Sequence, residues 1–264
     1  MEILPTSQIT RRQLLSRVVS LRNAGKIYDP ADSALDSVFY GSVDRYCEIA
    51  FRLHGHKKVL DVGSGTGLLL AVLTNLGHGC CGLDIINDPA ALPATYQRHA
   101  IEYKYCNVEV ETYPYPDSHF DGVTCCQVLE HFTHSHLPAL AEMKRVLRSG
   151  GVIEIDVPNV ASFRNRWRLI RGKNITWDYR EHYLHAKPMF QRGFSFYPVR
   201  HNREFTRAEL ACLLSESGFV DIHVEFLRDR NFRTGFKKLL SIGSAARNLI
   251  PSLRKSLIAF AKRP

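Results

Sequence analysis

Three glycines follow a short apolar run in the first third of the chain, in the segment Val59-Leu60-Asp61-Val62-Gly63-Ser64-Gly65-Thr66-Gly67-Leu68. Glycine permits positive φ angles and leaves no Cβ to obstruct a ligand. The apolar run predicts a buried strand, and residues 68–76 predict a helix that packs on a sheet. Such a unit presents backbone N–H groups at a helix start, where polar or anionic ligand groups bind. The segment therefore predicts a ligand-binding loop.

Two carboxylates are placed to act at this loop. Asp61 lies two residues before the first glycine, and Asp84 ends the next apolar run, Cys80-Cys81-Gly82-Leu83-Asp84. An acidic side chain at the tip of the second strand accepts hydrogen bonds from both hydroxyls of a ribose. Asp61 is an extra carboxylate that would hold an ammonium group or order the loop.

The spacing of the glycines excludes two common phosphate-binding motifs. A dinucleotide fingerprint needs G-x-G-x-x-G, whereas the third glycine here comes one position early. No Gly-Lys-Ser/Thr follows, which excludes a P-loop. The D-x-G-x-G-x-G form resembles the first motif of the class I S-adenosylmethionine (SAM)-dependent methyltransferases; the alternative is a glycine turn in another α/β protein. The resemblance implies that SAM is bound by Asp61, Gly63, Ser64, Gly65, Gly67, Asp84 and Ile85.

The third expected strand ends in Tyr105-Cys106-Asn107-Val108-Glu109. In the resembled family this junction contacts the adenine ring, usually through an acidic residue and the next backbone N–H. Asn107 occupies the acidic position, and an amide can both accept from the adenine amino group and donate to a ring nitrogen. The resemblance thus implies adenine contacts from Asn107 and Val108. Glu109 is a competing candidate, and a turn asparagine is the alternative for Asn107.

The fourth expected strand is followed by Gln127-Val128-Leu129-Glu130-His131, which resembles the family's x-V-L-E-H segment. Polar groups at the carboxyl end of a central strand lie in the ligand crevice of an open sheet. The resemblance places Gln127 beside the methionine part of SAM, and Glu130 and His131 where the methyl group leaves sulfur. In quinone-pathway O-methyltransferases an E-x-x-E-H cluster can hold a divalent cation. Because Gln127 replaces the first glutamate and removes one anionic ligand, we expect no metal here.

The alternation of strands and helices implies an α/β, doubly wound, mostly parallel sheet. The resemblance, continuous from about 57 to 157, implies the seven-stranded, Rossmann-like methyltransferase fold with an antiparallel last strand. Gly150 and Gly151 are expected to end a helix and turn into the fifth strand. Strands are expected near 58–62, 80–84, 101–106, 120–126, 152–157, 219–228 and 257–262, and core helices near 66–76, 89–98 and 136–147.

Four segments are expected: a helical cap (1–57), a SAM-binding core (58–157), a substrate lid (158–205) and a completion of the sheet (206–264). In the cap, Thr6 or Ser7 is expected to begin a helix that ends near Gly25, and a second helix is expected from Asp44 to Leu53. Tyr40, in the connector between them, is expected to line the substrate mouth, although packing is the commoner role for an aromatic residue.

The lid segment is dense in arginine and aromatic residues. That combination suits sugar stacking, phosphate clamping or single-stranded nucleic acid, whereas Trp167 and Trp177 fit a core role better than a ligand platform. Thr206 and Glu209 form a capping box that begins the next helix. His201 and Arg203 just before it resemble an H-x-R-x-F-T variant found in small-molecule and sugar O-methyltransferases, which implies that Arg203 contacts the substrate.

The net charge of +9 is unevenly spread. Residues 1–158 hold 14 Lys and Arg against 18 Asp and Glu, and residues 159–264 hold 21 against 8. The basic second half suggests a polyanionic partner: an anionic membrane surface, a phosphate-bearing substrate or nucleic acid. A solvated basic face is the alternative. The basic segment 232–250 is expected to form an amphipathic helix that rests on an anionic membrane or, as the more ordinary alternative, packs on the protein.

The seven cysteines contain no C-x-x-C pair and predict buried thiols in a reducing cytoplasm. No window approaches 18 apolar residues, so no membrane span is expected. Residues 1–25 are charged throughout and predict no signal peptide. We expect a cytoplasmic protein, with peripheral membrane contact as an option.

The chemistry expected of such a site is mostly alignment, because the SAM sulfonium already makes the methyl carbon electrophilic. A hydroxyl acceptor also benefits from a base near neutral pKa; His131 is the first choice and His201 the second. The sequence thus predicts methyl transfer to a small, sugar-containing or lipid-linked acceptor. Alternatives are a metal-assisted quinone-pathway reaction, a nucleic-acid methyltransferase and a non-enzymatic binder. Nucleic acid is the least favoured, since no Asn/Asp-Pro-Pro-Tyr/Phe motif follows the fourth strand.

Overall fold

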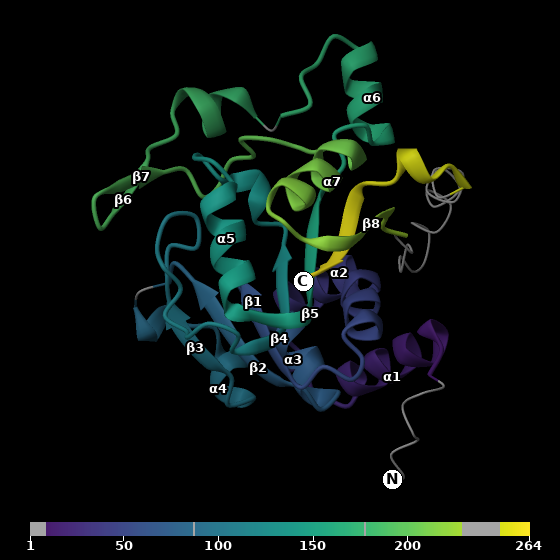
Figure 1. The fold of residues 1–264 in the computed structure, drawn as a ribbon. Coiled ribbons are helices and arrows are strands. Elements are labelled where there is room, and N and C mark those ends of the chain that lie inside the picture. Colours follow the sequence, from purple (N-terminus) through teal and green to yellow (C-terminus); the bar gives the residue numbers. More distant parts are fainter. Residues whose placement is uncertain (1–8, 87, 177, 229–248) are drawn as a thin grey trace.

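A seven-stranded sheet forms the centre of this computed structural model, which describes residues 9–86, 88–176, 178–228 and 249–264 (Figure 1). The strand order is β3-β2-β1-β4-β5-β9-β8. The first five strands in this order, β3, β2, β1, β4 and β5, pair in parallel with their neighbours, and β9 is antiparallel to both β5 and β8. The predicted fold class is confirmed. The strands are β1 Lys58–Val62, β2 Gly79–Asp84, β3 Glu102–Tyr105, β4 Phe120–Cys126, β5 Leu147–Pro158, β8 Val220–Phe226 and β9 Ser256–Lys262.

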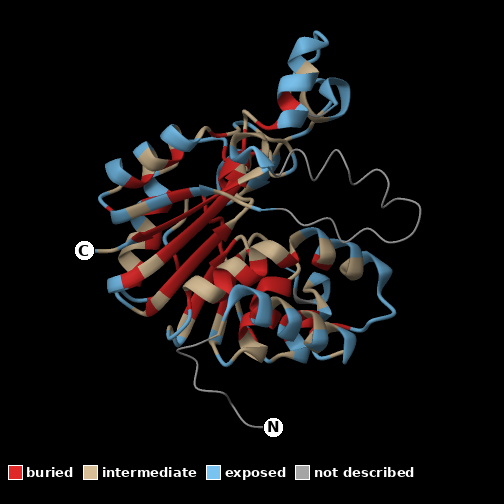
Figure 2. Ribbon diagram, turned by 90° about the vertical axis from the view of Figure 1, so that its right-hand side faces the viewer, coloured by how far each residue is buried: buried red, intermediate tan, exposed pale blue. Residues whose placement is uncertain are grey.

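Helices cover both faces of the sheet, and the strands between them are almost wholly buried (Figure 2). One apolar cluster joins the sheet to α1 (Arg11–Asn23), α2 (Ser33–Arg52) and α3 (Leu68–Asn75). A second joins the other face to α5 (Leu137–Val146) and α7 (Arg207–Glu216). Apolar runs such as β1 form central strands because both of their faces are covered.

The parallel register brings the carboxyl ends of the central strands to one edge. Leu60 in β1 pairs with Cys81 in β2 and with Val123 in β4. The residues that follow these strands therefore meet at the crevice where ligands bind in open α/β sheets.

The N-terminal helices begin at different residues from those predicted. Thr10 accepts from the backbone N–H of Gln13 and forms a capping box, so α1 begins at Arg11. The predicted caps, Thr6 and Ser7, lie outside the described residues, and the prediction was wrong. The helix does end before Gly25, which has a φ of +64°.

The second helix starts eleven residues earlier than predicted. Asp32 accepts from the backbone N–H groups of Ala34 and Leu35, and this cap begins α2 at Ser33. Tyr40 consequently lies inside α2 and not in a connector.

Two further boundaries differ in the core. The expected helix 89–98 divides into a 3-10 turn, η2 (Pro89–Ala91), and the short α4 (Ala94–Arg98), with Pro93 at the N-cap of α4. Gly150 and Gly151 do not end α5. Leu147 already has extended backbone and pairs with Phe120, so β5 begins four residues before Gly151.

The segment 158–205 stands at the carboxyl edge of the sheet (Figures 1 and 2). It contains α6 (Phe163–Ile170), a π-helical turn η4 (Arg180–Leu184) and a hairpin of β6 (Met189–Gln191) and β7 (Phe194–Phe196). Trp167 is 51% exposed and is not a core residue. Trp177 and most of the helix expected over 232–250 lie outside the described residues. Among the helices of the described ranges, none combines the length and apolarity that crossing a bilayer demands.

Candidate active site

The glycine loop joins β1 to α3 with three left-handed residues. The φ angles are +74° at Gly63, +48° at Gly65 and +71° at Gly67. A Cβ at Gly63 would lie 2.3 Å from Cγ2 of Val128, the residue after Gln127. Glycine is therefore required at Gly63 for two reasons, its conformation and the close approach of the segment that follows β4.

Asp84, at the tip of β2, accepts hydrogen bonds from the backbone of the glycine loop and of its own strand end. Its Oδ2 accepts from the Gly65 N–H at 2.6 Å, and its Oδ1 accepts from the Ile85 N–H at 2.7 Å. Each carboxylate oxygen can accept a second hydrogen bond. The carboxylate is thus fixed beside the loop with capacity left for two ribose hydroxyls.

Asp61 is buried beneath the same loop, 3% exposed. Its Oδ1 accepts from the Thr124 hydroxyl of β4 at 2.7 Å. Burial raises the pKa of Asp61 to about 7, and the nearby Asp84 adds to the shift while the Thr124 hydrogen bond opposes it. A bound ammonium group would favour the charged carboxylate.

Ser64 and Tyr96 stabilise the loop from within. The Ser64 hydroxyl donates to the Leu83 carbonyl at 3.2 Å and accepts from the Tyr96 hydroxyl at 2.7 Å. Tyr96, from α4, is 2% exposed, and its ring would lie 3.0 Å from a Cβ at Gly67. Sequence reasoning missed Tyr96, since an aromatic residue in a short helix carries no distinguishing spacing.

Asn107 is the amide available at the end of β3. Its Oδ1 accepts from the Glu109 N–H at 3.2 Å, whereas its buried Nδ2 has no hydrogen-bond partner among the described residues. Val108 beside it is buried. The competing Glu109 is occupied, because its Oε1 accepts from the Thr133 N–H at 2.6 Å and also contacts His134. An orphaned buried donor at this position fits an adenine ring nitrogen.

Gln127 connects the loop to a buried ion pair. It has a φ of +56°, and its Nε2 donates to Asp156 Oδ1 at 2.6 Å. Arg45 from α2 reaches the same carboxylate, with 2.9 Å between its Nε and Asp156 Oδ1. Positive φ at a non-glycine residue is a strained arrangement often found at functional sites.

Arg45 and Asp156 were not predicted. Arg45 has no sequence motif around it. The sequence did offer a signal for Asp156. In a strand expected to be central, Glu154 and Asp156 alternate with Ile153, Ile155 and Val157. A buried carboxylate in such a strand needs a partner.

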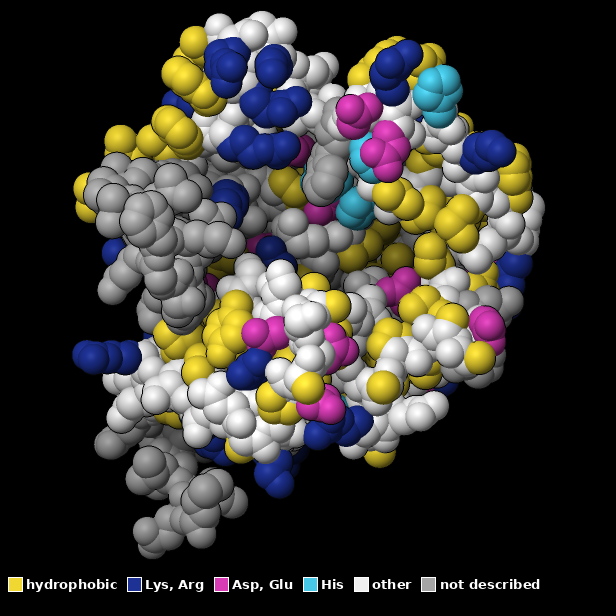
Figure 3. Space-filling model, turned by 180° about the vertical axis from the view of Figure 1, so that it is seen from behind, with side chains coloured by type: hydrophobic (Ala, Val, Ile, Leu, Met, Phe, Trp, Pro, Cys, Tyr) yellow, Lys and Arg dark blue, Asp and Glu magenta, His cyan; other side chains and the backbone are white. Residues whose placement is uncertain are grey.

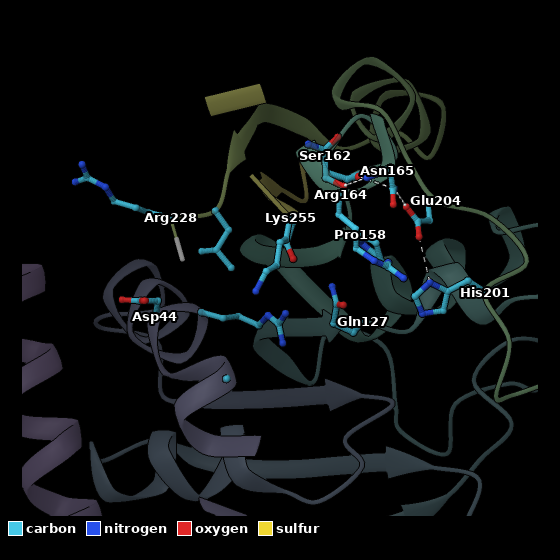
Figure 4. Close-up of a pocket in the computed structure, with 15 residues that line it drawn as sticks. Asp44, Gln127, Pro158, Ser162, Arg164, Asn165, His201, Glu204, Arg228 and Lys255 are labelled. Atoms are coloured by element: carbon cyan, nitrogen blue, oxygen red, sulfur yellow. Dashed lines mark hydrogen bonds and ion pairs between the residues drawn. The ribbon is translucent and has the colours of Figure 1, made fainter. Parts of the chain in front are cut away.

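A cavity of about 300 Å³ opens at the carboxyl ends of β4 and β5, between α2 and α6 (Figure 4). Gln127 lies on its floor, so the cavity adjoins the loop crevice. Its other polar and charged lining residues are Asp44, Arg45, Asn159, Ser162, Arg164, Asn165, His201, Glu204, Arg228, Lys255 and Ser256.

His201 and Glu204 form a histidine–carboxylate pair at the cavity wall (Figure 4). His201 Nδ1 lies 3.6 Å from Glu204 Oε1, and Glu204 Oε2 accepts from Asn165 Nδ2 at 2.5 Å. Asn165 is 2% exposed and is held by the Asn159 and Val160 carbonyl oxygens. Asn165 of α6 therefore fixes Glu204 beside the His201 ring, and sequence reasoning missed both Glu204 and Asn165.

His131 lies beside His201, with ring centroids 4.9 Å apart. Its Nδ1 donates to the Arg200 carbonyl at 3.0 Å, which leaves Nε2 as the acceptor nitrogen. Burial lowers the pKa of His131, so the ring is neutral at pH 7.

Glu130 is fully buried, and within the described residues neither of its carboxylate oxygens has a hydrogen-bond partner. Burial raises the pKa of Glu130 to about 8. The ligating atoms of Glu130, His131 and His201 all lie within 4.8 Å of one another, a spacing that would suit a metal ion.

Two predicted substrate contacts lie elsewhere. Tyr40 packs edge-on against Phe39, and the Arg22 guanidinium lies 5.3 Å from its ring centroid. Arg203 is exposed and contacts Glu209 at the start of α7. Neither is among the described residues that line the cavity. Tyr40 is displaced from the mouth because α2 begins early and turns its neighbours Gly41, Asp44 and Arg45 toward the cavity.

Residues 60–155 match the protein family described as "Methyltransferase domain". A ubiquinone biosynthesis O-methyltransferase from Glaesserella parasuis is 30% identical over 110 residues, which cover 39% of this chain and 46% of that protein. One from Pseudomonas aeruginosa is 29% identical over 106 residues, covering 39% and 45%. The chain thus spans less than half the length of the curated relatives it matches.

Two solved structures share the fold at low identity. A SAM-dependent methyltransferase from Archaeoglobus fulgidus has a TM-score of 0.54 and 18% identity, covering 86% of this chain and 93% of that one. The Burkholderia thailandensis 1,6-didemethyltoxoflavin-N1-methyltransferase, solved with bound 1,6-didemethyltoxoflavin and S-adenosylhomocysteine, has a TM-score of 0.51 and 18% identity, covering 98% of this chain and 93% of that one. The chain therefore carries a methyltransferase domain with the class I SAM-dependent methyltransferase fold.

Proposed function

We propose that the protein transfers the methyl group of SAM to a hydroxyl of a small-molecule acceptor bound in the cavity beside Gln127. The acceptor we favour is a sugar-containing or lipid-linked metabolite with an anionic group. The observation that carries the proposal is the histidine–carboxylate pair, His201 and Glu204, in a cavity that adjoins the glycine loop.

The residues of the loop crevice fit SAM. Asp84 would accept hydrogen bonds from the ribose hydroxyls, and Asp61 would order the loop beside the ammonium group. The Nδ2 of Asn107, which has no partner among the described residues, would donate to the adenine. Gln127, between crevice and cavity, would contact the methionine part. When bound, SAM supplies an electrophilic methyl carbon on a sulfonium.

The protein's part in the reaction is to position the acceptor and to move one proton. His201 accepts the proton of the acceptor hydroxyl as the new oxygen–carbon bond forms and the sulfur–carbon bond breaks. Glu204 holds the ring in place and stabilises the imidazolium that results, and Asn165 fixes Glu204. His201 takes precedence over His131 because it lines the cavity.

The charge of the cavity supports an anionic acceptor. Arg164 and Lys255 line it, while Arg45 is paired with Asp156 and the Arg228 side chain extends away from the cavity (Figure 4). Guanidinium groups bind phosphate or carboxylate oxygens in two-point hydrogen bonds. Asp44 on the α2 side offers an acceptor for sugar hydroxyls.

The test is a coupled S-adenosylhomocysteine-release assay across nucleotide sugars, polyprenyl-phosphate-linked sugars, catechols and RNA. With the acceptor found, His201→Ala should lower kcat by about 10²- to 10⁴-fold, the usual contribution of a general base. Its affinity for S-adenosylhomocysteine should be unchanged. His131→Ala is the matched control and should cost less. Full turnover by His201→Ala would remove the base assignment, and no cofactor binding by the wild type would remove the proposal.

A second candidate is a divalent-cation-assisted O-methylation of a catechol-like quinone precursor. It is favoured by the buried carboxylate of Glu130, which has no hydrogen-bond partner in the described part of the chain and lies next to His131 and His201. The names of the curated relatives also favour it. Two imidazoles and one carboxylate suit Mn²⁺, Fe²⁺ or Zn²⁺ better than Mg²⁺.

Dialysis against a chelator separates the two candidates. The base mechanism predicts unchanged turnover. The metal mechanism predicts a loss that Mn²⁺ or Zn²⁺ restores in the wild type but not in Glu130→Gln.

A further inference from the structure

Helix α6 carries three apolar side chains on the side away from the protein. Asn165 faces the body, since it is 2% exposed and donates to Glu204 and to two backbone carbonyls. Phe163, Trp167 and Ile170 lie at spacings of four and three residues on the opposite side of the helix. They are 49%, 51% and 77% exposed. We call these three side chains the α6 face.

Cationic residues flank the α6 face. By helical geometry, Arg166 lies along one margin and Arg164 and Arg171 along the other. No aspartate or glutamate occurs between Asp156 and Asp178, so nothing acidic in that stretch of sequence offsets them. Figure 3 shows basic and apolar side chains gathered together on this projecting corner of the molecule.

The helix projects from the body and is exposed along most of its length (Figure 2). An ordinary surface helix turns its apolar stripe toward the core and its charges toward solvent. In α6 the stripe points outward between arginines, an arrangement typical of helices that lie in a membrane interface. Tryptophan is itself enriched at that depth.

We infer that the α6 face docks on an anionic lipid bilayer, with Phe163, Trp167 and Ile170 inserted at the headgroup boundary and the flanking arginines on lipid phosphates. A nucleic acid would use the arginines but would leave Ile170 in water. This face belongs to a different stretch of sequence from the segment 232–250, for which the sequence alone suggested membrane contact. The cavity opens beside the first turn of α6, where Ser162, Arg164 and Asn165 line it, so docking would bring it next to the lipid.

The test is co-sedimentation with phosphatidylcholine vesicles, with and without an equal part of phosphatidylglycerol, in the absence of SAM and acceptor. The wild type should bind only the anionic vesicles, and added salt should weaken binding. The double variant Arg166→Gln/Arg171→Gln should bind anionic vesicles about 30-fold more weakly, because each lost cation lowers the affinity roughly fivefold. Arg12→Gln with Arg17→Gln, on exposed positions of α1, is the control with the same loss of charge.

A second measurement follows insertion of the apolar side chains. In a Trp177→Phe background Trp167 is the single tryptophan, and its emission should shift to the blue on anionic vesicles. Ile170→Ser should weaken this shift, whereas Val38→Ser, an exposed apolar position of α2, should not. Circular dichroism and the thermal transition check that each variant is folded.

Equal binding to neutral vesicles, no binding by the folded wild type, or α6 variants that bind like the wild type would each overturn the inference. RNA binding that depends on Arg166 and Arg171, without vesicle binding, would also overturn it. None of these results depends on methyl transfer, so the inference and the proposed function can fail separately.

Discussion

Buried carboxylates line the ligand edge of the sheet. Asp61, Glu130, Glu154 and Asp156 are all almost wholly buried, and burial raises the pKa of each. Arg45 forms the ion pair with Asp156. The other three are therefore held closer to the neutral acid than an exposed carboxyl would be. A site of this kind is strongly sensitive to pH and to any cation that enters it.

Asp61 should make stability depend on pH. Its pKa rises from 3.8 to about 7 on folding, so the stabilisation is complete below pH 4 and is lost as the pH rises toward 7. The linkage slope for one such group is about −1.4 kcal/mol per pH unit. Asp61→Asn keeps an acceptor for Thr124 but lacks this slope. Urea unfolding should show that, between pH 5 and pH 7, the free energy of unfolding of the wild type falls by about 2 kcal/mol more than that of the variant. Parallel pH profiles would refute this.

Asp84 should govern cofactor affinity. Asp84→Asn retains the shape of the side chain but loses the charge that strengthens hydrogen bonds to ribose hydroxyls. We expect S-adenosylhomocysteine to bind about 10- to 100-fold more weakly, as for the loss of charge-assisted hydrogen bonds. Titration calorimetry measures the change. Asp88→Asn, an exposed residue four positions later, is the control, and equal affinities for the two variants would contradict the assignment.

The residues predicted from sequence share one property: their partners are near in the chain or fixed by a strand–loop–helix unit. Asp61, Gly63 and Asp84 belong to that class. Arg45 could not be predicted, because its partner Asp156 lies more than a hundred residues away. Glu204 lies three residues from His201, but the distant Asn165 that fixes its carboxylate is not visible in the sequence. Tyr40 was assigned by its expected place in a connector and Arg203 by the resemblance to the H-x-R-x-F-T variant. In the structure Tyr40 packs against Phe39, and Arg203 contacts Glu209 at the start of α7.

At the scale of elements, boundaries follow the strongest local cap. Asp32 and Thr10 begin α2 and α1 by accepting backbone N–H groups, and both outweigh the apolar periodicity used for prediction. The glycine loop was predicted well because its conformation is dictated by residue type. What the sequence does not disclose is the segment after β4 that presses on it, through Val128.

Gly63 and Gly65 should therefore respond differently to alanine. Both have positive φ, but a Cβ at Gly63 meets Val128 at 2.3 Å, whereas one at Gly65 meets nothing within 4 Å. Gly65→Ala should cost about 1 kcal/mol from backbone strain. Gly63→Ala should cost roughly 1–3 kcal/mol more from overpacking. Denaturant unfolding measures both.

Val128→Ala supplies the check on that comparison. It should recover part of the loss in Gly63→Ala and none of the loss in Gly65→Ala. Additive effects in both pairs would show that Val128 does not press on the loop.

At the scale of the whole molecule, the sheet depends on a strand distant in sequence. β9 lies between β5 and β8 and pairs with both, and residues 257–261 are buried. The strand order was predictable only through the family resemblance, because periodicity gives strands but not their neighbours. The outward face of α6 was not predictable either, since an amphipathic pattern does not say which side meets the body.

Deleting residues 256–264 should abolish the fold and not merely shorten it. The deletion would expose the edges of β5 and β8 and remove five buried side chains from the core. Near-ultraviolet circular dichroism should lose its signal and the thermal transition should disappear. Lys262→Ala, which loses only an exposed ion pair with Asp221, should stay within about 0.5 kcal/mol of the wild type. A cooperative transition in the truncated protein would contradict this.

The place of β9 has a consequence for synthesis. During translation β5 emerges first, and all of residues 159–255 must be made before its antiparallel neighbour exists. Until then one side of a long strand, most of it buried in the finished fold, is open to any other extended chain, including another nascent copy. Yield in the cell should accordingly depend on chaperone supply and on slow, cool expression more than on the stability of the finished protein.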